Sequence, residues 1–242
     1  MEKSQSPYEV IQIDENSWRI EENGVRSFLF AGKDKALLVD SGFGTGNIKD
    51  AVDSLTTLPV MLINTHADRD HIGCNNQFEK IFMHPAEFDR YNQNLQSQGG
   101  SMDFGTNAIW EHDIIDIGGR SFEVILIPGH TPGSIALLDS ENRILISGDS
   151  VQAGMVYMFG PGRNINAYIH SMKKLSDINI RGRFDTVYPS HGPFPVNADI
   201  MDALISGADD VRGGKISGTK PPYETQSPAL LYDLGAVRFL YK

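Results

Sequence analysis

The segment Thr65–Gly73, THADRDHIG, constrains this chain more than any other stretch of its sequence. It brings four side chains that can bind a metal close together along the chain, and these are His66, Asp68, Asp70 and His71. The apolar run Val60–Asn64, VMLIN, comes just before it and predicts a short buried strand. We therefore expect the four side chains in the loop at the carboxyl end of that strand, where α/β sheets usually hold their functional groups.

Three further candidate ligands follow predicted strands in the second half of the chain. His130 stands in PGHTPGS after FEVILI, Asp149 in SGDS after RILIS, and His191 in PSHG after TVY. Each has Gly, Pro or Ser beside it, and these residues turn a chain sharply. A lone His or Asp at a strand end is often only a cap or a turn residue. The recurrence of the same context favours a shared metal site, because two adjacent divalent metals need about six or seven imidazole and carboxylate ligands, one of them bridging.

The order HADRDH, PGHTPGS, SGDS and SHG resembles the metallo-β-lactamase superfamily of metal-dependent hydrolases, in particular its glyoxalase II-like and lactonase-like branch. The resemblance runs from about residue 25 to residue 192. It implies an α/β fold, a four-layer αββα sandwich of the metallo-β-lactamase type.

The resemblance also implies a role for each candidate ligand. His66 and His130 would belong to a first metal site, Asp70, His71 and His191 would hold a second metal, and Asp149 would bridge the two. Asp40, in LLVDSG, matches an aspartate that follows an early strand of the family. We expect Asp40 to orient ligands through hydrogen bonds rather than to bind metal itself.

Asp68 departs from the family motif, which reads His-x-His-x-Asp-His and has a second histidine at this position. A carboxylate adds a negative charge and favours harder metals such as iron or manganese. Three alternatives stay open: Asp68 binds the first metal, the first site is weak and only the second fills, or Asp68 lies outside the ligand shell. We expect one or two divalent metal ions, with zinc implied by the family and iron or manganese allowed by Asp68.

The activity that the resemblance implies is hydrolysis of a small carbonyl substrate, such as a thioester, a lactone or a similar ester, by a metal-bound hydroxide. Asp70 would orient the hydroxide. Tyr157, in the segment AGMVYMFGPGR that follows Asp149, would donate a hydrogen bond to a substrate oxygen. For this segment, an apolar loop packed on a sheet edge is the alternative. A diiron redox enzyme and a metal-binding protein without catalysis remain the alternative functions.

Composition indicates a single domain over 1–242, because 242 residues with 40% hydrophobic content can bury one large core. The formal charge of -10 argues against a nucleic-acid partner and leaves a small-molecule substrate.

The start of the chain lacks the apolar core of a secretory signal and no run is long enough to span a bilayer, so we expect a cytoplasmic protein without membrane contact. The single cysteine, Cys74, fits a reducing compartment and is expected to be a buried structural thiol rather than a ligand.

The apolar patterning predicts four opening strands of an antiparallel sheet, over 8–13, 17–22, 25–32 and 36–42, and a helix near 47–58. In the second half it predicts strands over 122–127, 134–139, 143–149 and 186–192, helices near 164–175 and 197–206, and final strands within 228–242. The segment 92–107 is polar, contains Gly and is long for a connection, which predicts an exposed loop or lid.

Overall fold

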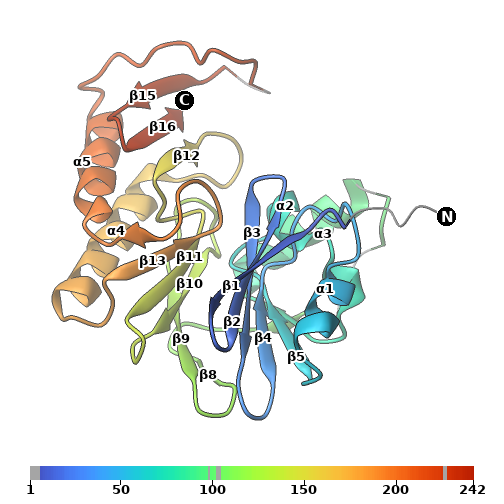
Figure 1. Cartoon of the computed structure of the whole chain (residues 1–242). Helices are drawn as coiled ribbons and strands as arrows, with labels where there is room; N and C mark the ends of the chain where they lie inside the picture. The colour runs from blue at the N-terminus through green and yellow to red at the C-terminus, as the bar shows by residue number, and fades with distance from the viewer. Residues whose placement is uncertain (1–5, 98, 102–104, 226–227) are drawn as a thin grey trace. The chain divides into compact units, whose positions relative to one another are not determined.

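The computed structural model describes residues 6–97, 99–101, 105–225 and 228–242 (Figure 1). The chain divides into two compact units, Met1–Ser121 and Phe122–Lys242, and each of them combines a β-sheet with helices packed on it. The single domain expected over 1–242 stays a prediction. Among the residues that the structure describes, no helix has both the length and the apolar composition needed to cross a membrane.

The first unit is built on a seven-stranded sheet with the strands in chain order from β1 to β7. Its first four strands are antiparallel, which confirms the predicted opening, and they are β1 (Glu9–Asp14), β2 (Ser17–Glu22), β3 (Val25–Ala31) and β4 (Ala36–Val39). Asn23 and Gly24 make the turn between β2 and β3 with φ angles of 50° and 86°, as an Asn-Gly hairpin turn requires. Three parallel strands continue the sheet, namely β5 (Val60–Ile63), β6 (Ile81–Met83) and β7 (Asn107–Ala108).

Helices cover one face of this sheet. The Asn47 side chain caps α1 (Ile48–Leu55) by accepting from the Lys49 N–H, and the predicted helix near 47–58 is thereby confirmed. The short helix α2 (Arg69–Ile72) follows β5, and α3 (Phe88–Ser97) follows β6 through a 3₁₀ turn, Pro85–Glu87. Apolar side chains of α1 and α3 form one core cluster with the strands, including Leu29, Leu38, Leu62, Ile48, Val52 and Tyr91. The strand β8 (Ile114–Asp116) is the last complete strand of this unit along the chain.

The loop predicted over 92–107 is wrong in its first part, because Asn92–Ser97 belongs to α3. Residues 98 and 102–104 of that segment lie outside the described residues. The helix forms here because Tyr91 and Leu95 stand four positions apart and share a face that packs on the core cluster. The polar residues between them hide this short apolar face in the sequence.

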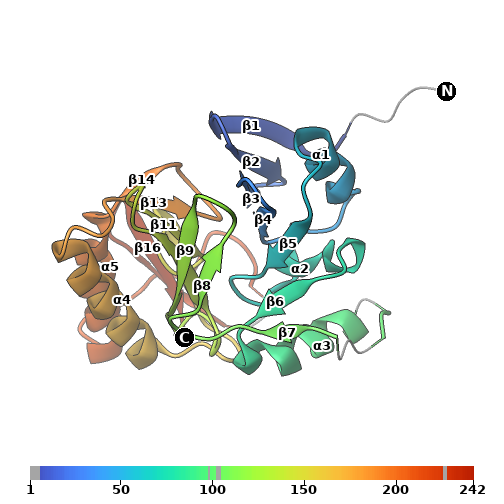
Figure 2. The same ribbon diagram turned by 90° about the horizontal axis from the view of Figure 1, so that it is seen from below.

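The second unit contains a larger sheet with the strands ordered β14-β13-β11-β10-β9. They are β9 (Ser121–Leu126), β10 (Ile135–Asp139), β11 (Ile144–Gly148), β13 (Thr186–Pro189) and β14 (Val196–Asn197). Only the β11–β13 pair in this row is parallel. The helices α4 (Ile165–Ile180) and α5 (Ile200–Gly213) lie side by side next to this sheet (Figure 2). All the predicted strands and both helices of this half are thus present.

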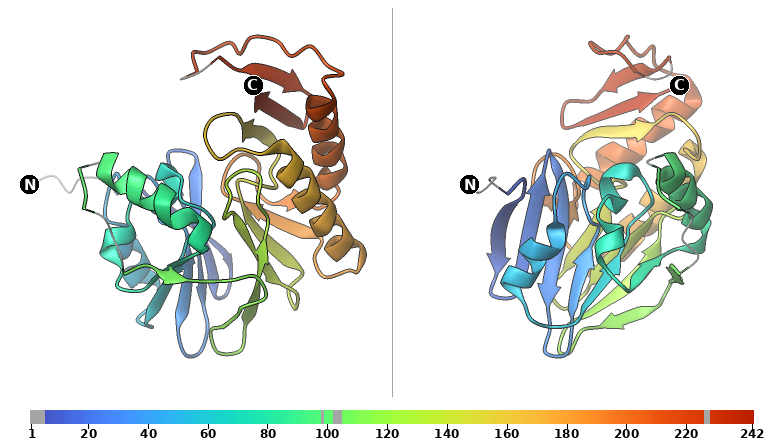
Figure 3. Two further views of the ribbon diagram at one scale, coloured as in Figure 1. Left: turned by 180° about the vertical axis from the view of Figure 1, so that it is seen from behind. Right: turned by 90° about the vertical axis from the view of Figure 1, so that its right-hand side faces the viewer.

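A small second sheet of this unit has the order β12-β16-β15 and lies beside α5 (Figure 3). Its strands are β12 (Gly154–Met158), β15 (Leu230–Asp233) and β16 (Val237–Tyr241). The final strands confirm the prediction for 228–242. The segment 153–163, expected to be an exposed or packed loop, instead begins with β12, since β16 pairs with it in parallel and Val156 is buried in the core.

Candidate metal-binding residues

The candidate ligands of the first unit lie in the connection between β5 and α2 and at the start of α2. His66 and Asp68 lie in the connecting loop, and Asp70 and His71 lie in the first turn of the helix. The two imidazoles are buried, their ring centroids are 4.0 Å apart, and ligand atoms of His66 lie within 4.8 Å of those of His71 and of Asp68. This confirms the expected position of the motif at the carboxyl end of the strand over Val60–Asn64.

Asp40, at the end of β4, organises the two histidines through hydrogen bonds. Its Oδ1 accepts from the Thr65 backbone N–H at 2.8 Å, and its Oδ2 lies 2.8 Å from both the Thr65 hydroxyl and His71 Nδ1. The Thr65 hydroxyl donates its only hydrogen to Asp40, so it can only accept from His66 Nδ1, which is 3.0 Å away. Both imidazoles therefore carry their proton on Nδ1 and keep the Nε2 lone pair for a ligand role, and the predicted orienting role of Asp40 agrees with these contacts.

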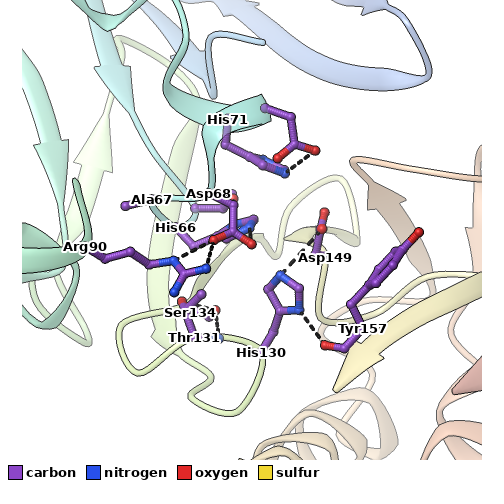
Figure 4. A network of polar contacts seen from close by, with 12 residues as sticks. His66, Ala67, Asp68, His71, Arg90, His130, Thr131, Ser134, Asp149 and Tyr157 are labelled. Atoms are coloured by element: carbon purple, nitrogen blue, oxygen red, sulfur yellow. Dashed lines mark hydrogen bonds and ion pairs between the residues drawn. The ribbon is translucent and has the colours of Figure 1, made fainter. Parts of the chain in front are cut away.

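Asp68 has contacts with an arginine that sequence reasoning did not single out. Arg90 of α3 donates from Nε to Asp68 Oδ1 at 2.5 Å, and its Nη2 makes an ion pair with the same oxygen (Figure 4). The other carboxylate oxygen, Oδ2, lies 3.6 Å from His66 Nε2. Asp68 is thus held by a cation on one oxygen and faces a candidate ligand with the other.

Two further side chains of the segment around α3 hold the backbone between His66 and Asp68. The buried Glu87 accepts from the Ala67 N–H at 2.8 Å, and Asn94 donates to the Ala67 carbonyl at 2.7 Å. These residues were also missed. Glu87, Arg90 and Asn94 are spaced by three and then four positions, which places them on one face of a helical segment. This spacing is the signal in the sequence that could have identified them.

In the second unit, Asp149 lies between two imidazoles. It follows β11 directly, its Oδ2 lies 3.5 Å from His130 Nε2, and its Oδ1 lies 3.4 Å from His191 Nε2. The His130 ring is fixed by its other nitrogen, because Nδ1 lies 3.3 Å from the backbone oxygen of Tyr157, which can only accept (Figure 4). Each oxygen of Asp149 thus faces a different histidine, as in a carboxylate that bridges two metals.

The local fold around His130 depends on a glycine. Gly129 has a φ of 142°, and a Cβ there would lie 2.4 Å from the Cα of Tyr168 in α4, so a larger residue does not fit. After His130, the Ser134 hydroxyl accepts from the Thr131 N–H at 3.0 Å and closes the turn into β10. Gly129 and this turn together fix the backbone on both sides of His130.

Tyr157 projects its side chain from β12 and is 40% exposed. Its backbone oxygen orients His130, whereas the predicted contact of its hydroxyl with a substrate stays a prediction. Cys74 is buried, as predicted, and its Sγ lies 3.4 Å from the Tyr8 hydroxyl and 3.4 Å from the Gly46 carbonyl. Burial, reinforced by the contact with Cys74, raises the pKa of Tyr8 above its ordinary value.

The donor set of each unit fits a divalent metal. Within each unit, neighbouring ligand atoms of different residues are between 3.4 and 3.7 Å apart. Two ligands of one tetrahedral metal, each at about 2.0–2.1 Å, lie about 3.3 Å from one another. The ring nitrogen not needed for a metal is held by an oxygen in His66, His71 and His130. Each unit therefore presents preoriented imidazole and carboxylate groups.

Comparison with known proteins identifies the family. The model of the metallo-beta-lactamase superfamily matches residues 20–191. Among curated proteins, the chain is 28% identical over 207 residues to the acyl-coenzyme A thioesterase MBLAC2 of Gallus gallus, across 72% of this chain and 75% of the relative. It is 32% identical over 117 residues to a hydroxyacylglutathione hydrolase of Rippkaea orientalis, across 44% of this chain and 42% of the relative.

Solved structures agree on the fold. A metallo-beta-lactamase from Pontibacter korlensis superimposes with a TM-score of 0.68 at 19% identity, over 84% of this chain and 99% of that chain. The expected α/β fold of the metallo-β-lactamase type is therefore confirmed. The matched range includes both halves of the ligand pattern, from His66 to His191. The chain accordingly belongs to the metallo-beta-lactamase superfamily and is a metal-dependent hydrolase.

Proposed function

We propose that the protein hydrolyses a small thioester or a related ester at a binuclear metal centre. In this proposal one metal is held by His66, Asp68 and His130, the other by Asp70, His71 and His191, and Asp149 bridges them. The observation that carries the proposal is the position of the Asp149 carboxylate, which directs one oxygen at His130 and the other at His191. The ligand types suit zinc, which is typical of the family, and the carboxylate of Asp68 also admits iron or manganese.

Thioesters are favoured over other carbonyl substrates by the relatives. The relatives named as acyl-coenzyme A thioesterases match 72% of this chain, and others are named as hydroxyacylglutathione hydrolases. The net charge of -10 supports a small-molecule substrate rather than a nucleic acid. A cytoplasmic location and the absence of a membrane partner stay predictions.

When bound, the metals would acidify a water molecule and polarise the substrate carbonyl. The protein's own groups then have distinct tasks. Asp40 and Thr65 keep His66 and His71 in the tautomer that presents Nε2. Asp70, with its side chain 23% exposed, would accept a hydrogen bond from the attacking water and orient it towards the carbonyl carbon. Tyr157 would donate a hydrogen bond to the oxygen on which negative charge develops.

The substitution Asp70→Asn tests the proposal. We expect turnover of acyl-coenzyme A, acylglutathione, lactone and simple ester substrates to fall by about 100-fold or more, because an amide orients the water poorly and binds metal weakly. Turnover and metal content should be measured on the same preparations. The matched control is Asp50→Asn, because Asp50 is an exposed acid in the first turn of α1 and should be replaceable without loss of turnover.

Two results would overturn the proposal. One is a metal-loaded protein that hydrolyses nothing across the panel. The other is Asp70→Asn with the turnover of the parent. An iron content with redox activity would instead favour the diiron alternative, for which the carboxylate of Asp68 is the supporting observation.

A further inference from the structure

Asp68 is the position where this chain departs from its family, and the structure shows what accompanies the change. A carboxylate in place of an imidazole adds one negative charge, and it has two oxygens that can bind a metal where the imidazole uses one nitrogen. Both features alter a metal site, because charge selects harder metals and a second oxygen permits binding through two atoms. Something that neutralises the charge and occupies one oxygen would restore the properties of an imidazole.

Arg90 does both. Its Nε and Nη2 converge on Oδ1 of Asp68, and Oδ2 is left facing His66 Nε2 at 3.6 Å. A guanidinium group stays charged at any physiological pH, so the Asp68–Arg90 pair is neutral overall, as an imidazole is. The side chains of Asp68 and Arg90 are 15% and 27% exposed, so solvent screens the pair less than an ion pair at the open surface.

The helix that carries Arg90 is itself tied to the ligand loop. Glu87 and Asn94 bind the N–H and the carbonyl of Ala67, the residue between His66 and Asp68. Arg69, which follows Asp68, donates to the Ser97 hydroxyl at 2.8 Å. Polar side chains of α3 and of the turn before it therefore hold the backbone at Ala67 and the side chain of Arg69, on either side of Asp68, and the guanidinium of Arg90 is placed relative to this loop.

We propose that Arg90 is a positioning residue that turns Asp68 into a neutral, one-atom metal ligand, in the role that a histidine has in the family motif. The proposal rests on the proposed function, because it assumes that Asp68 binds a metal together with His66. Arg90 acts through Asp68, by holding Oδ1 and presenting Oδ2. The extra carboxylate therefore does not by itself turn the site into one for hard metals.

The test is metal binding to stripped, full-length protein, measured by elemental analysis and by chelator competition with zinc and with manganese. We expect Arg90→Gln to weaken one binding step for zinc by about 10–100-fold, the usual effect of removing a partner of a metal ligand, and to leave the other step unchanged. At the weakened step, the preference for zinc over manganese should also fall, because the freed carboxylate is charged and can use both oxygens.

Further variants distinguish a role of Arg90 in positioning Asp68 from a general contribution of Arg90 to the stability of the fold. Arg90→Lys keeps the charge without the planar fork and should restore part of the zinc affinity. Asp68→Ala should lose the same step, and the double variant should bind no more weakly than Asp68→Ala alone, since Arg90 acts only through Asp68. Arg143→Gln is the matched control, because it breaks the exposed ion pair between Arg143 and Asp185, with Nε to Oδ2 at 2.9 Å, and should change no binding step.

Arg90→Gln with zinc and manganese affinities equal to those of the parent would overturn the inference, as would additive losses in the double variant. Tighter zinc binding by Arg90→Gln would also overturn it, because Arg90 would then withhold Asp68 from the metal. A parent protein that binds no metal would refute the proposed function along with this inference. A parent that binds two metals beside an unaffected Arg90→Gln variant would refute only the role of Arg90.

Discussion

Replacing Thr65 by valine removes a single buried oxygen that contacts both the candidate ligand His66 and the orienting residue Asp40. The Thr65 hydroxyl donates to Asp40 at 2.8 Å and accepts from His66 Nδ1 at 3.0 Å, and all three residues are buried. Valine keeps the shape of threonine but has neither a donor nor an acceptor. Asp40 retains the Thr65 N–H and His71, so the loss is confined to the hydroxyl and to the side of the network that reaches His66.

The expected loss of stability follows from those two contacts. A buried hydrogen bond to a charged acceptor contributes about 1.5–3 kcal/mol, and one between neutral groups contributes about 0.5–1.5 kcal/mol. The extra methyl group of valine offsets part of this loss, since burying a methyl-sized apolar group stabilises by roughly 0.8 kcal/mol. We therefore expect Thr65→Val to lower the free energy of unfolding of the metal-free protein by about 2–3 kcal/mol.

Urea unfolding of the metal-free protein measures this difference directly. An unchanged slope of the unfolding free energy against urea concentration would show that the folded state is intact. The control is Thr65→Ser, which keeps the hydroxyl and should remain within about 1 kcal/mol of the parent. Zinc affinity should also fall in Thr65→Val, by about 10–100-fold, because the His66 ring loses the contact that sets its tautomer. If Thr65→Val and Thr65→Ser are equally stable and bind zinc equally well, the hydroxyl does not organise the site.

Three shorter predictions address other parts of the first unit. Asp68→His in the Arg90→Gln background, where no guanidinium faces the new imidazole, should raise the preference for zinc over manganese above that of Arg90→Gln alone, and equal preferences of these two variants would show that Asp68 is not a ligand. Cys74→Ala should leave metal content and turnover intact, because the thiol contacts Tyr8 and a backbone carbonyl, and a metal-free product would contradict this. Burial lowers the pKa of His84 below its ordinary value, so the unfolded chain binds a proton more readily and stability falls as the pH drops below about 6.5. His84→Asn should reduce this acid sensitivity in unfolding curves recorded from pH 7.5 to 5.5, and curves parallel to those of the parent would refute it.

Much of the candidate site could be predicted because its residues carry short-range signals. A strand of apolar residues that ends in Gly, Pro or Ser beside a His or Asp is recognisable within about ten residues, and His130, Asp149 and His191 all stand in such a context. Short runs rich in aliphatic and aromatic residues, as in β3 and β10, likewise indicate which segments are buried strands. These features depend on neighbours in the chain, so local reading finds them.

The partners of those residues depend on contacts between segments far apart in the chain. Arg90 lies 22 positions after Asp68, on a helix whose apolar face consists of Phe88, Tyr91 and Leu95, and nothing local distinguishes it from a solvent-exposed arginine. The strand β12 was missed for the same reason, because its pairing partner β16 begins at Val237. The amino-acid sequence by itself determined which side chains can bind metal and at which strand ends they stand. Only the tertiary structure decided which cation holds Asp68 and which oxygens orient the histidines, because such contacts are selected by packing over the whole unit rather than by neighbouring residues.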